Sequence, residues 1–185
     1  MDNSIILRAY LVNLEISFCR LAGNSLILYL NCQPGEDKGF IIWIEPTWHF
    51  ANQTEVLLGS RQAQVETDEE LQEVFEPLKQ LLGKKIKNLI IEVITNDLTI
   101  QFDEFSIKSF VADPTDDHTW HVIDNEKRRR FKANPKEMTV YNCLCTKNWS
   151  LVKQQKSRVF SGLRRHQERN PTHGNYTRNN PIRSI

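Results

Sequence analysis

The sequence predicts a β-rich α+β fold made of two antiparallel meander repeats, which are joined by one helix and followed by a basic C-terminal extension. The first observation is an internal repeat: Asn24-Ser25-Leu26 returns as Asn96-Asp97-Leu98, and Thr47-Trp48-His49 returns as Thr119-Trp120-His121. Both pairs are separated by 72 positions (96 − 24 and 119 − 47). The second observation is strand periodicity on either side of one strongly amphipathic helical segment.

Length and cysteine usage set the class of protein. A chain of 185 residues is long enough for an apolar core, so it does not need disulfides for stability. The four cysteines lack a paired CxxC spacing, and we interpret them as thiols in a reducing compartment. The apolar runs are too short to span a membrane, and no signal-peptide pattern is present, so we expect a cytoplasmic protein with no membrane partner.

Charge divides the chain into two parts. Residues 1–126 contain 9 Lys and Arg against 21 Asp and Glu, a net charge of −12, whereas residues 127–185 contain 15 against 2, a net charge of +13. We therefore predict an acidic duplicated domain over 1–126 and a basic extension over 127–185. Within the domain, repeat one spans 9–60, the linker helix 67–82 and repeat two 84–125.

The first repeat reads as a three-stranded meander followed by two short strands. Apolar residues partly alternate from Tyr10, and the turn chemistry of residues 31–37 separates two segments rich in Ile, Leu, Phe and Trp. Pro46 is expected to end the third strand, because proline cannot donate a hydrogen bond to a sheet. The predicted strands are Tyr10–Phe18, Ser25–Leu30, Gly39–Ile44, Trp48–Phe50 and Val56–Leu58.

The linker helix carries the clearest local pattern. Thr67 and Glu70 fit a capping box, and Leu71, Val74, Leu78 and Leu81 recur at helical spacing. We expect Pro77 to kink or divide this helix and Gly83 to follow its end. Its apolar stripe is expected to pack on a sheet made by the two meanders.

The second repeat is expected to repeat the meander with strands at Ile86–Ile94, Leu98–Phe102 and Phe105–Val111. The loop Asp113–Asp117 then leads to Trp120, in the place of the shorter Glu45-Pro46 connection. Beyond Gly162 the extension has little to bury, so we expect it to be mobile unless a partner orders it.

Two arrangements of histidine suggest metal chemistry. His49 and His121 would meet across a pseudo-twofold axis if the Trp-His pairs formed a duplicated site; alternatively, the tryptophans only close the hydrophobic layers. Asp116, His118 and His121 offer oxygen and imidazole ligands of the kind found in metal-dependent nucleases; alternatively, they form a solvated acidic loop. The chain has no GxSxG, GxGxxG, GxxxxGK[ST] or HExxH motif, which favours a non-enzymatic protein without a cofactor.

The basic extension suggests binding of nucleic acid. Its cationic residues would contact phosphates, and its aromatic residues would stack on unpaired bases. The candidate contacts are Lys127, Arg128, Arg129, Arg130, Lys132, Arg164 and Arg165.

The acidic domain suggests a different partner, a basic protein such as a nuclease-type toxin, because an acidic binder can occupy the basic groove of such an enzyme with electrostatically steered association. The candidate partner-binding residues are Glu66, Asp68, Glu69, Glu70, Glu73, Asp113, Asp116 and Asp117.

Both repeats contain a short strand, a turn and a further strand leading to tryptophan. The pattern comprises Leu82–Ile86, Asn96–Phe102 and Trp120 in the second repeat, and Asn24–Leu30, Trp48 and Leu58–Ser60 in the first. Through this pattern, residues 9–125 resemble a group of small bacterial β-meander domains, some of which act as immunity proteins beside secreted toxins. The resemblance implies an immunity function and no catalytic residue. An immunity-like binding protein is therefore the preferred hypothesis, ahead of a nucleic-acid-binding protein and a metal-dependent nuclease.

Overall fold

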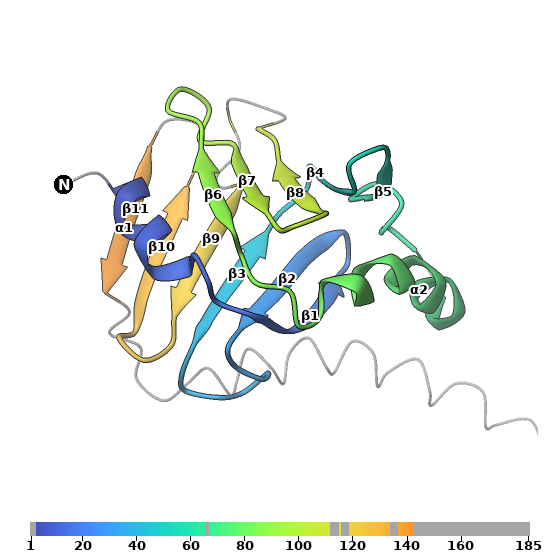
Figure 1. Ribbon diagram of the computed structural model, residues 1–185, viewed down its shortest axis with the longest axis horizontal. Coiled ribbons are helices and arrows are strands. Elements are labelled where there is room, and N and C mark those ends of the chain that lie inside the picture. The colour runs from blue at the N-terminus through green and yellow to red at the C-terminus, as the bar shows by residue number, and fades with distance from the viewer. Residues whose placement is uncertain (1–2, 66, 112–114, 116–118, 134–136, 143–185) are drawn as a thin grey trace, which may run out of the picture. The chain divides into compact units, whose positions relative to one another are not determined.

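The computed structural model describes residues 3–65, 67–111, 115, 119–133 and 137–142 (Figure 1). The elements, in chain order, are α1 (Asn3–Leu11), β1 (Ile16–Ala22), β2 (Ser25–Leu30), β3 (Phe40–Ile44), β4 (Trp48–Ala51), β5 (Val56–Gly59), α2 (Asp68–Phe75), the 3-10 helix η1 (Glu76–Leu81), β6 (Asn88–Ile91), β7 (Leu98–Gln101), β8 (Ser106–Ser109), β9 (Trp120–Asp124), β10 (Arg129–Ala133) and β11 (Met138–Asn142).

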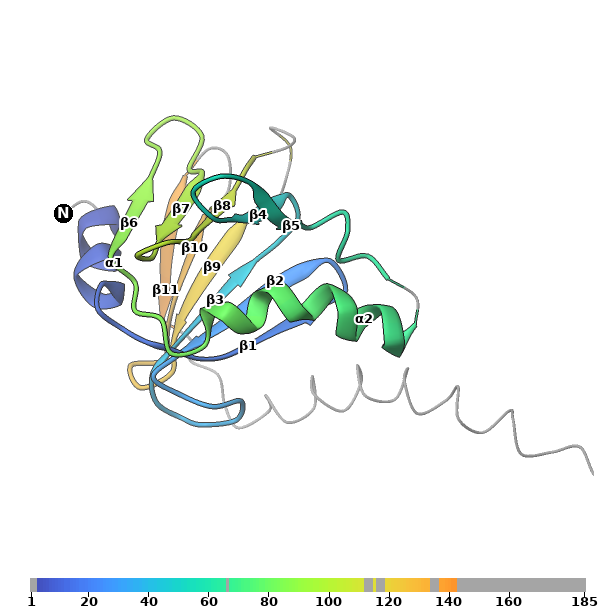
Figure 2. The ribbon, with the colours of Figure 1, turned by 45° about the vertical axis from the view of Figure 1, so that its right-hand side comes forward.

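The strands form two antiparallel sheets that share one hydrophobic core, which confirms the predicted β-rich α+β class. The six-stranded sheet has the order β1-β2-β3-β9-β10-β11, and the five-stranded sheet has the order β5-β4-β8-β7-β6. Leu28 and Val122 of the first sheet lie in the same buried cluster as Phe50 and Ile100 of the second. One face of each sheet therefore faces the core, and its other face points outward (Figures 1 and 2).

Each sheet is built from both repeats. The meander β1-β2-β3 continues into the hairpin β9–β10 of the second repeat, and the meander β8-β7-β6 continues into the hairpin β4–β5 of the first. Ile44 pairs with Trp120 at the first junction, and Ser109 pairs with Trp48 at the second. The repeats thus exchange hairpins, so neither sheet is complete within one repeat.

A short antiparallel pairing places the symmetry axis. The backbone N–H of Ile86 donates to the carbonyl of Leu14 (3.0 Å), and the N–H of Asn13 donates to the carbonyl of Ile86 (2.8 Å). Leu14 and Ile86 stand 72 positions apart (86 − 14), the same offset as the sequence repeat. The antiparallel bridge Glu15–Lys85 thus places Leu14 opposite its own repeat equivalent, as a local twofold axis would. Together with the matching strand orders of the two sheets, this contact indicates that the repeats are related by pseudo-twofold symmetry.

The repeat length is kept although individual loops differ. Ser109 follows its equivalent Ile44 by only 65 positions (109 − 44), whereas Trp120 follows Trp48 by 72 (120 − 48). Counted between paired residues, the step from Leu98 to Ser109 is 7 positions shorter than that from Leu26 to Ile44 (11 against 18). The step from Ser109 to Trp120 is 7 positions longer than that from Ile44 to Trp48 (11 against 4). The compensation brings β9 back into register with β3, which explains why the offset survives in the sequence.

The two repeated tryptophans make the same interaction. The indole N–H of Trp48 donates to the carbonyl of Asn24 (2.8 Å), and that of Trp120 donates to the carbonyl of Asn96 (2.7 Å). Both side chains are buried. Each tryptophan therefore ties the first strand of a hairpin to the turn between the first two strands of its own repeat, as expected for a duplicated packing role.

The first helix departs from the sequence-based expectation of a strand starting at Tyr10. Residues 3–11 form α1, and β1 begins only at Ile16. Leu7 and Leu11, four residues apart, are both fully buried. The apolar residues of this segment thus satisfy a helical period, and the short alternation around Tyr10 was misleading.

The linker helix follows its local chemistry closely. Thr67 caps α2, and the reciprocal hydrogen bonds with Glu70 complete the predicted capping box. At Glu76, directly before Pro77, the α-helix gives way to η1. Gly83 follows with a φ of +78°, a conformation that favours glycine. Leu78 and Leu81 of η1 are buried, so η1 supplies the deepest core contacts of this segment.

The sheet continues past the boundary at residue 126 that composition suggested. β10 and β11 complete the six-stranded sheet, and the compact unit runs from Met1 to Leu144. The change of charge coincides with the β9–β10 turn and so falls inside a hairpin. The second unit, Cys145–Ile185, lies outside the described residues, as does the segment expected to be mobile.

Hairpin exchange predicts the behaviour of a nicked chain. A protease site inserted after Gln64, in the connection between β5 and α2, should allow cleavage without separation of the two fragments. Each fragment contributes strands to both sheets, so separation would expose the shared core. Size-exclusion chromatography should give one peak under native conditions and two in denaturant. Two native peaks would contradict the reciprocal arrangement.

The matched tryptophan contacts predict equal losses of stability. Trp48→Phe and Trp120→Phe each remove the same indole hydrogen bond and should lower the free energy of unfolding by similar amounts, about 1–3 kcal/mol. Urea denaturation monitored by circular dichroism measures the change. Trp43→Phe, on the outward face of β3, is the control and should cost less. A marked inequality between the two core variants would argue against equivalent roles.

Candidate functional site

Helix α2 carries the part of the predicted acidic surface that the structure describes. Glu69, Glu70 and Glu73 are exposed, and Asp68 begins the helix. Val74 and Phe75 pack against the core, which fixes the opposite side of the helix. The other candidates, Glu66, Asp113, Asp116 and Asp117, lie outside the described residues.

Glu69 and Glu73 of α2 lie outside the ion pairs of the described residues. The helix has no basic residue in its last turn. Among the described residues the ion pairs join Glu36 with Lys38, Glu76 with Lys79, Glu104 with Lys84 and Asp103 with Lys87, and none of these pairs involves Glu69 or Glu73. The outer surface of α2 therefore keeps its negative charge, whereas Glu70 also closes the capping box.

The basic residues within 127–132 of the nucleic-acid hypothesis do not all lie on one surface. Lys127 and Arg128 lie in the β9–β10 turn, and Arg129 begins β10. Lys127 points toward α1, with its Nζ 4.7 Å from the centroid of the Tyr10 ring. Arg130 and Lys132 alternate with the buried Phe131 and Ala133, so they project from the opposite, outward face of the sheet. Arg164 and Arg165 lie outside the described residues.

Arg130 and Lys132 belong to a larger surface that the sequence did not reveal. We define the outer sheet face as the outward residues of the six-stranded sheet that form two cross-strand rows. Its members are Arg20, Ile27, Trp43, His121, Lys132 and Thr139 in one row and Phe18, Tyr29, Ile41, Ile123, Arg130 and Tyr141 in the other. Composition places the run around Arg130 in an extension, so the sequence alone does not predict that it lies near Trp43.

His121 lies within the outer sheet face and is buried. Its ring stacks on Trp43, with centroids 5.6 Å apart and an interplanar angle of 21°. Its Nε2 lies 2.7 Å from Nη2 of Arg130, and this guanidinium opposes the approach of a metal cation to that nitrogen. Asp116 and His118, the other proposed ligands, lie outside the described residues. Within the described part of the chain, no cluster of three or more His, Cys, Asp or Glu side chains suits a metal ion.

His49 occupies the equivalent place in the other sheet, so the two histidines do not form one site. It pairs with Lys108 of β8, and its ring lies 4.9 Å from that of Phe110. Partial burial, with a smaller contribution from the Lys108 charge, lowers the pKa of His49 below its ordinary value of 6.5. The neutral imidazole is thus the form that the fold prefers.

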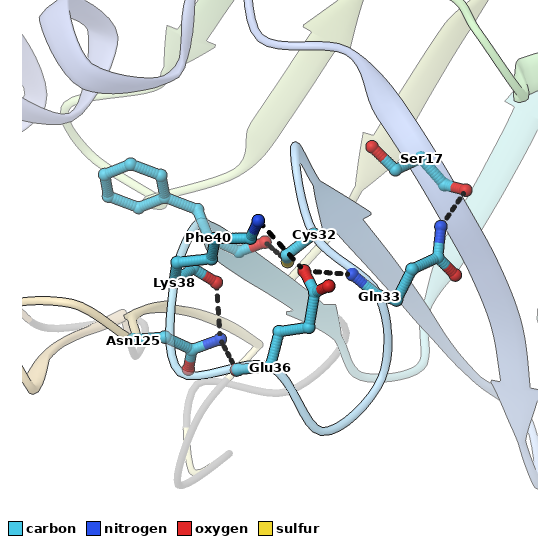
Figure 3. A network of polar contacts seen from close by, with 7 residues as sticks. All are labelled: Ser17, Cys32, Gln33, Glu36, Lys38, Phe40 and Asn125. Atoms are coloured by element: carbon cyan, nitrogen blue, oxygen red, sulfur yellow. Dashed lines mark hydrogen bonds and ion pairs between the residues drawn. The ribbon is translucent and has the colours of Figure 1, made fainter.

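The loop between β2 and β3 is held in place by polar contacts (Figure 3). The side-chain amide of Asn125 donates to the carbonyls of Glu36 and Lys38, both at 3.2 Å, and joins this loop to the β9–β10 turn. Burial raises the pKa of the Cys32 thiol, whose Sγ lies 3.5 Å from the Phe40 carbonyl. A Cβ at residue 39 would lie only 2.5 Å from the Leu30 carbonyl, so Gly39 permits this close approach. The network is structural support for the end of the sheet.

Comparisons with protein-family models, with curated proteins and with solved structures return no match for this chain. Functional inference therefore depends on the geometry and chemistry of the described residues. None of their helices combines the length and the apolar composition that crossing a bilayer requires.

The lowered pKa of His49 predicts a dependence of stability on pH. The unfolded chain binds a proton near pH 6.5, where the folded protein resists protonation, so stability should fall as the pH drops through that value. His49→Asn should reduce the decline in melting temperature between about pH 7.5 and about pH 5.5. Thermal melts across this range provide the measurement, with Thr54→Ala as an exposed control. An unchanged pH profile in His49→Asn would contradict the prediction.

Proposed function

We propose that this chain is a non-enzymatic binding protein that engages a basic protein through the acidic surface of α2, as an immunity protein engages a nuclease-type toxin. The observation that carries the proposal is a helix whose apolar side is packed against the core while Glu69 and Glu73 remain exposed and outside the ion pairs of the described residues.

The anchoring of α2 supports a role in recognition. The capping box fixes its first turn, and η1 holds its C-terminal end through the buried Leu78 and Leu81. A helix held at both ends presents its carboxylates with little loss of conformational entropy on binding. The surface charge is therefore preorganised for a partner with a complementary basic groove.

The charge balance supports rapid association with such a partner. Residues 1–144 contain 15 Lys and Arg against 22 Asp and Glu, a net charge of −7. A negative field of this kind attracts a basic protein from a distance and raises the association rate, particularly at low salt. The binding of a nuclease-type toxin, whose substrate groove is positive, would use the same attraction.

We propose the cytoplasm as the place of action. Cys19 and Cys32 are free thiols, and both are buried in the fold without a disulfide. Such thiols persist in a reducing compartment. A protein that neutralises a toxin made by its own cell would also have to act there.

Charge reversal on α2 tests the proposal. The proposal predicts a toxin gene beside the gene for this chain, and the partner to use is the purified product of that gene, rendered inactive by substitution. Wild type should form a stable complex, and Glu69→Lys/Glu73→Lys should lower the association rate about tenfold, because attraction becomes repulsion. Stopped-flow or surface plasmon resonance measures this rate at low and high salt.

A matched control separates local recognition from total charge. Glu55→Lys/Glu92→Lys makes the same change in net charge at exposed positions outside α2. It should lower the association rate by less than about threefold. Equal losses in the two double variants would exclude α2 as the contact surface, and a lack of binding by wild type would refute the proposed function.

A further inference from the structure

We propose that the outer sheet face binds single-stranded RNA. The proposal is independent of the acidic surface of α2, and it differs from the hypothesis of a basic extension. Of the cations in that extension, it uses Arg130 and Lys132, and it adds Arg20 and Trp43 from the first repeat.

Strand register brings aromatic and cationic side chains together. Trp43 pairs with His121, which in turn pairs with Lys132, whereas on the other side Trp43 pairs with Ile27 and then Arg20. Adjacent strands lie about 4.8 Å apart, so the two cations flank the tryptophan at roughly 10 Å on either side. A strand of nucleic acid that crosses the sheet would meet a cation, an aromatic ring and a second cation in turn.

Charge is segregated on this surface. None of the side chains in the two rows is a carboxylate, although residues 1–144 carry a net charge of −7. The nearest acidic residues along β3 and before β11 are Glu45 and Glu137, two positions from Trp43 and Thr139, and the Glu45 carboxylate accepts a hydrogen bond from Ser25 (2.6 Å). The rows themselves are therefore basic, as a phosphate backbone requires.

The accessible side chains stand above a buried floor. Arg20 and Tyr141 are exposed, and Trp43, Arg130 and Lys132 are partly exposed. Ile27 and Tyr29 form the floor, with Phe18 and Trp43 packed against them. The guanidinium of Arg20 lies 5.9 Å from the centroid of the Tyr29 ring. Trp43 is held by stacking on His121, so an incoming base would meet a ring whose orientation is already set.

The other sheet shows that the scaffold does not require these residues. Its equivalent outward positions carry Thr99 and Lys108 in place of Ile27 and Trp43. Thr99 pairs with Lys108, and Lys108 pairs with His49, in the same register as Ile27, Trp43 and His121. Gln101 likewise stands where the first repeat has Tyr29. The fold is thus compatible with a polar outward face, and the aromatic residues of the six-stranded sheet need another explanation.

Base stacking on aromatic side chains combined with phosphate contacts to Arg and Lys is the chemistry by which proteins bind single strands. Thr139 and Tyr141 end the two rows beside Lys132 and Arg130. Their hydroxyl groups can hydrogen-bond to the ribose 2′-hydroxyl, which DNA lacks. This donor and acceptor chemistry selects RNA over DNA as the proposed ligand.

The test uses the full chain and a fluorescein-labelled oligouridine RNA of about 12 nucleotides, followed by fluorescence anisotropy. Arg130→Gln/Lys132→Gln should weaken binding about tenfold and reduce the slope of log affinity against log salt by about 1.4. Lys127→Gln/Arg129→Gln removes two cations of the same run that do not belong to the face. This control should change affinity by less than about threefold.

The aromatic contact is tested separately. Trp43→Leu should weaken binding about fivefold or more and should abolish the part of the RNA-induced tryptophan quenching that arises from base stacking. Trp48 and Trp120 are buried and cannot stack on a base, and Trp149 is replaced by Phe in both proteins compared so that it cannot contribute either. Arg130→Lys/Lys132→Arg keeps both charges and should retain affinity within about threefold, which guards against a merely structural effect. Circular dichroism and thermal melts of each variant identify any loss of folding.

Four outcomes would overturn the proposal. These are no RNA binding by wild type at low salt, equal losses in the two double glutamine variants, full affinity in a folded Trp43→Leu, and equal affinity for RNA and a DNA strand of the same length. Equal losses would assign the binding to nonspecific charge attraction, and equal affinity for DNA would remove the assignment to RNA.

Discussion

The reciprocal pairing of β3 with β9 and of β8 with β4 is the constraint on which the rest of the structure depends. Each pairing joins the meander of one repeat to the hairpin of the other, and the core closes only when both have formed. The Leu14–Ile86 pairing adds backbone hydrogen bonds near the pseudo-twofold axis. The shortened β7–β8 turn is offset by the longer β8–β9 connection because β9 must return to a place set by the first repeat.

Both candidate surfaces are departures from this symmetry. The connection between the repeats needs only to bury Leu78 and Leu81, so the exposed side of α2 is free to carry Glu69 and Glu73. In the sheets the core-facing positions are constrained by packing, whereas the outward ones are not. One outward face therefore carries Trp43 where the other carries Lys108. Positions at which the two repeats differ are therefore the ones most informative about function.

Several features were predictable because their causes are local. The capping box needs only Thr67 and Glu70, and the change of helix type at Pro77 needs only a missing backbone donor. The candidate surfaces were harder to predict. The acidic helix was found from composition, but the outer sheet face was missed, because Trp43 and Arg130 are far apart in the sequence and meet only through the β3–β9–β10 register.

The sequence by itself determined the repeat, the positions of most strands and the linker helix, because periodicity and capping act over a few residues. Only the tertiary structure decided which hairpin completes which sheet and that β10 and β11 belong to the six-stranded sheet. Which strands pair depends on the burial of complementary surfaces from distant segments, and composition contains no information about that burial. In β10 the buried Phe131 and Ala133 join the strand to the core, while the alternating Arg130 and Lys132 give it the composition of a solvated tail.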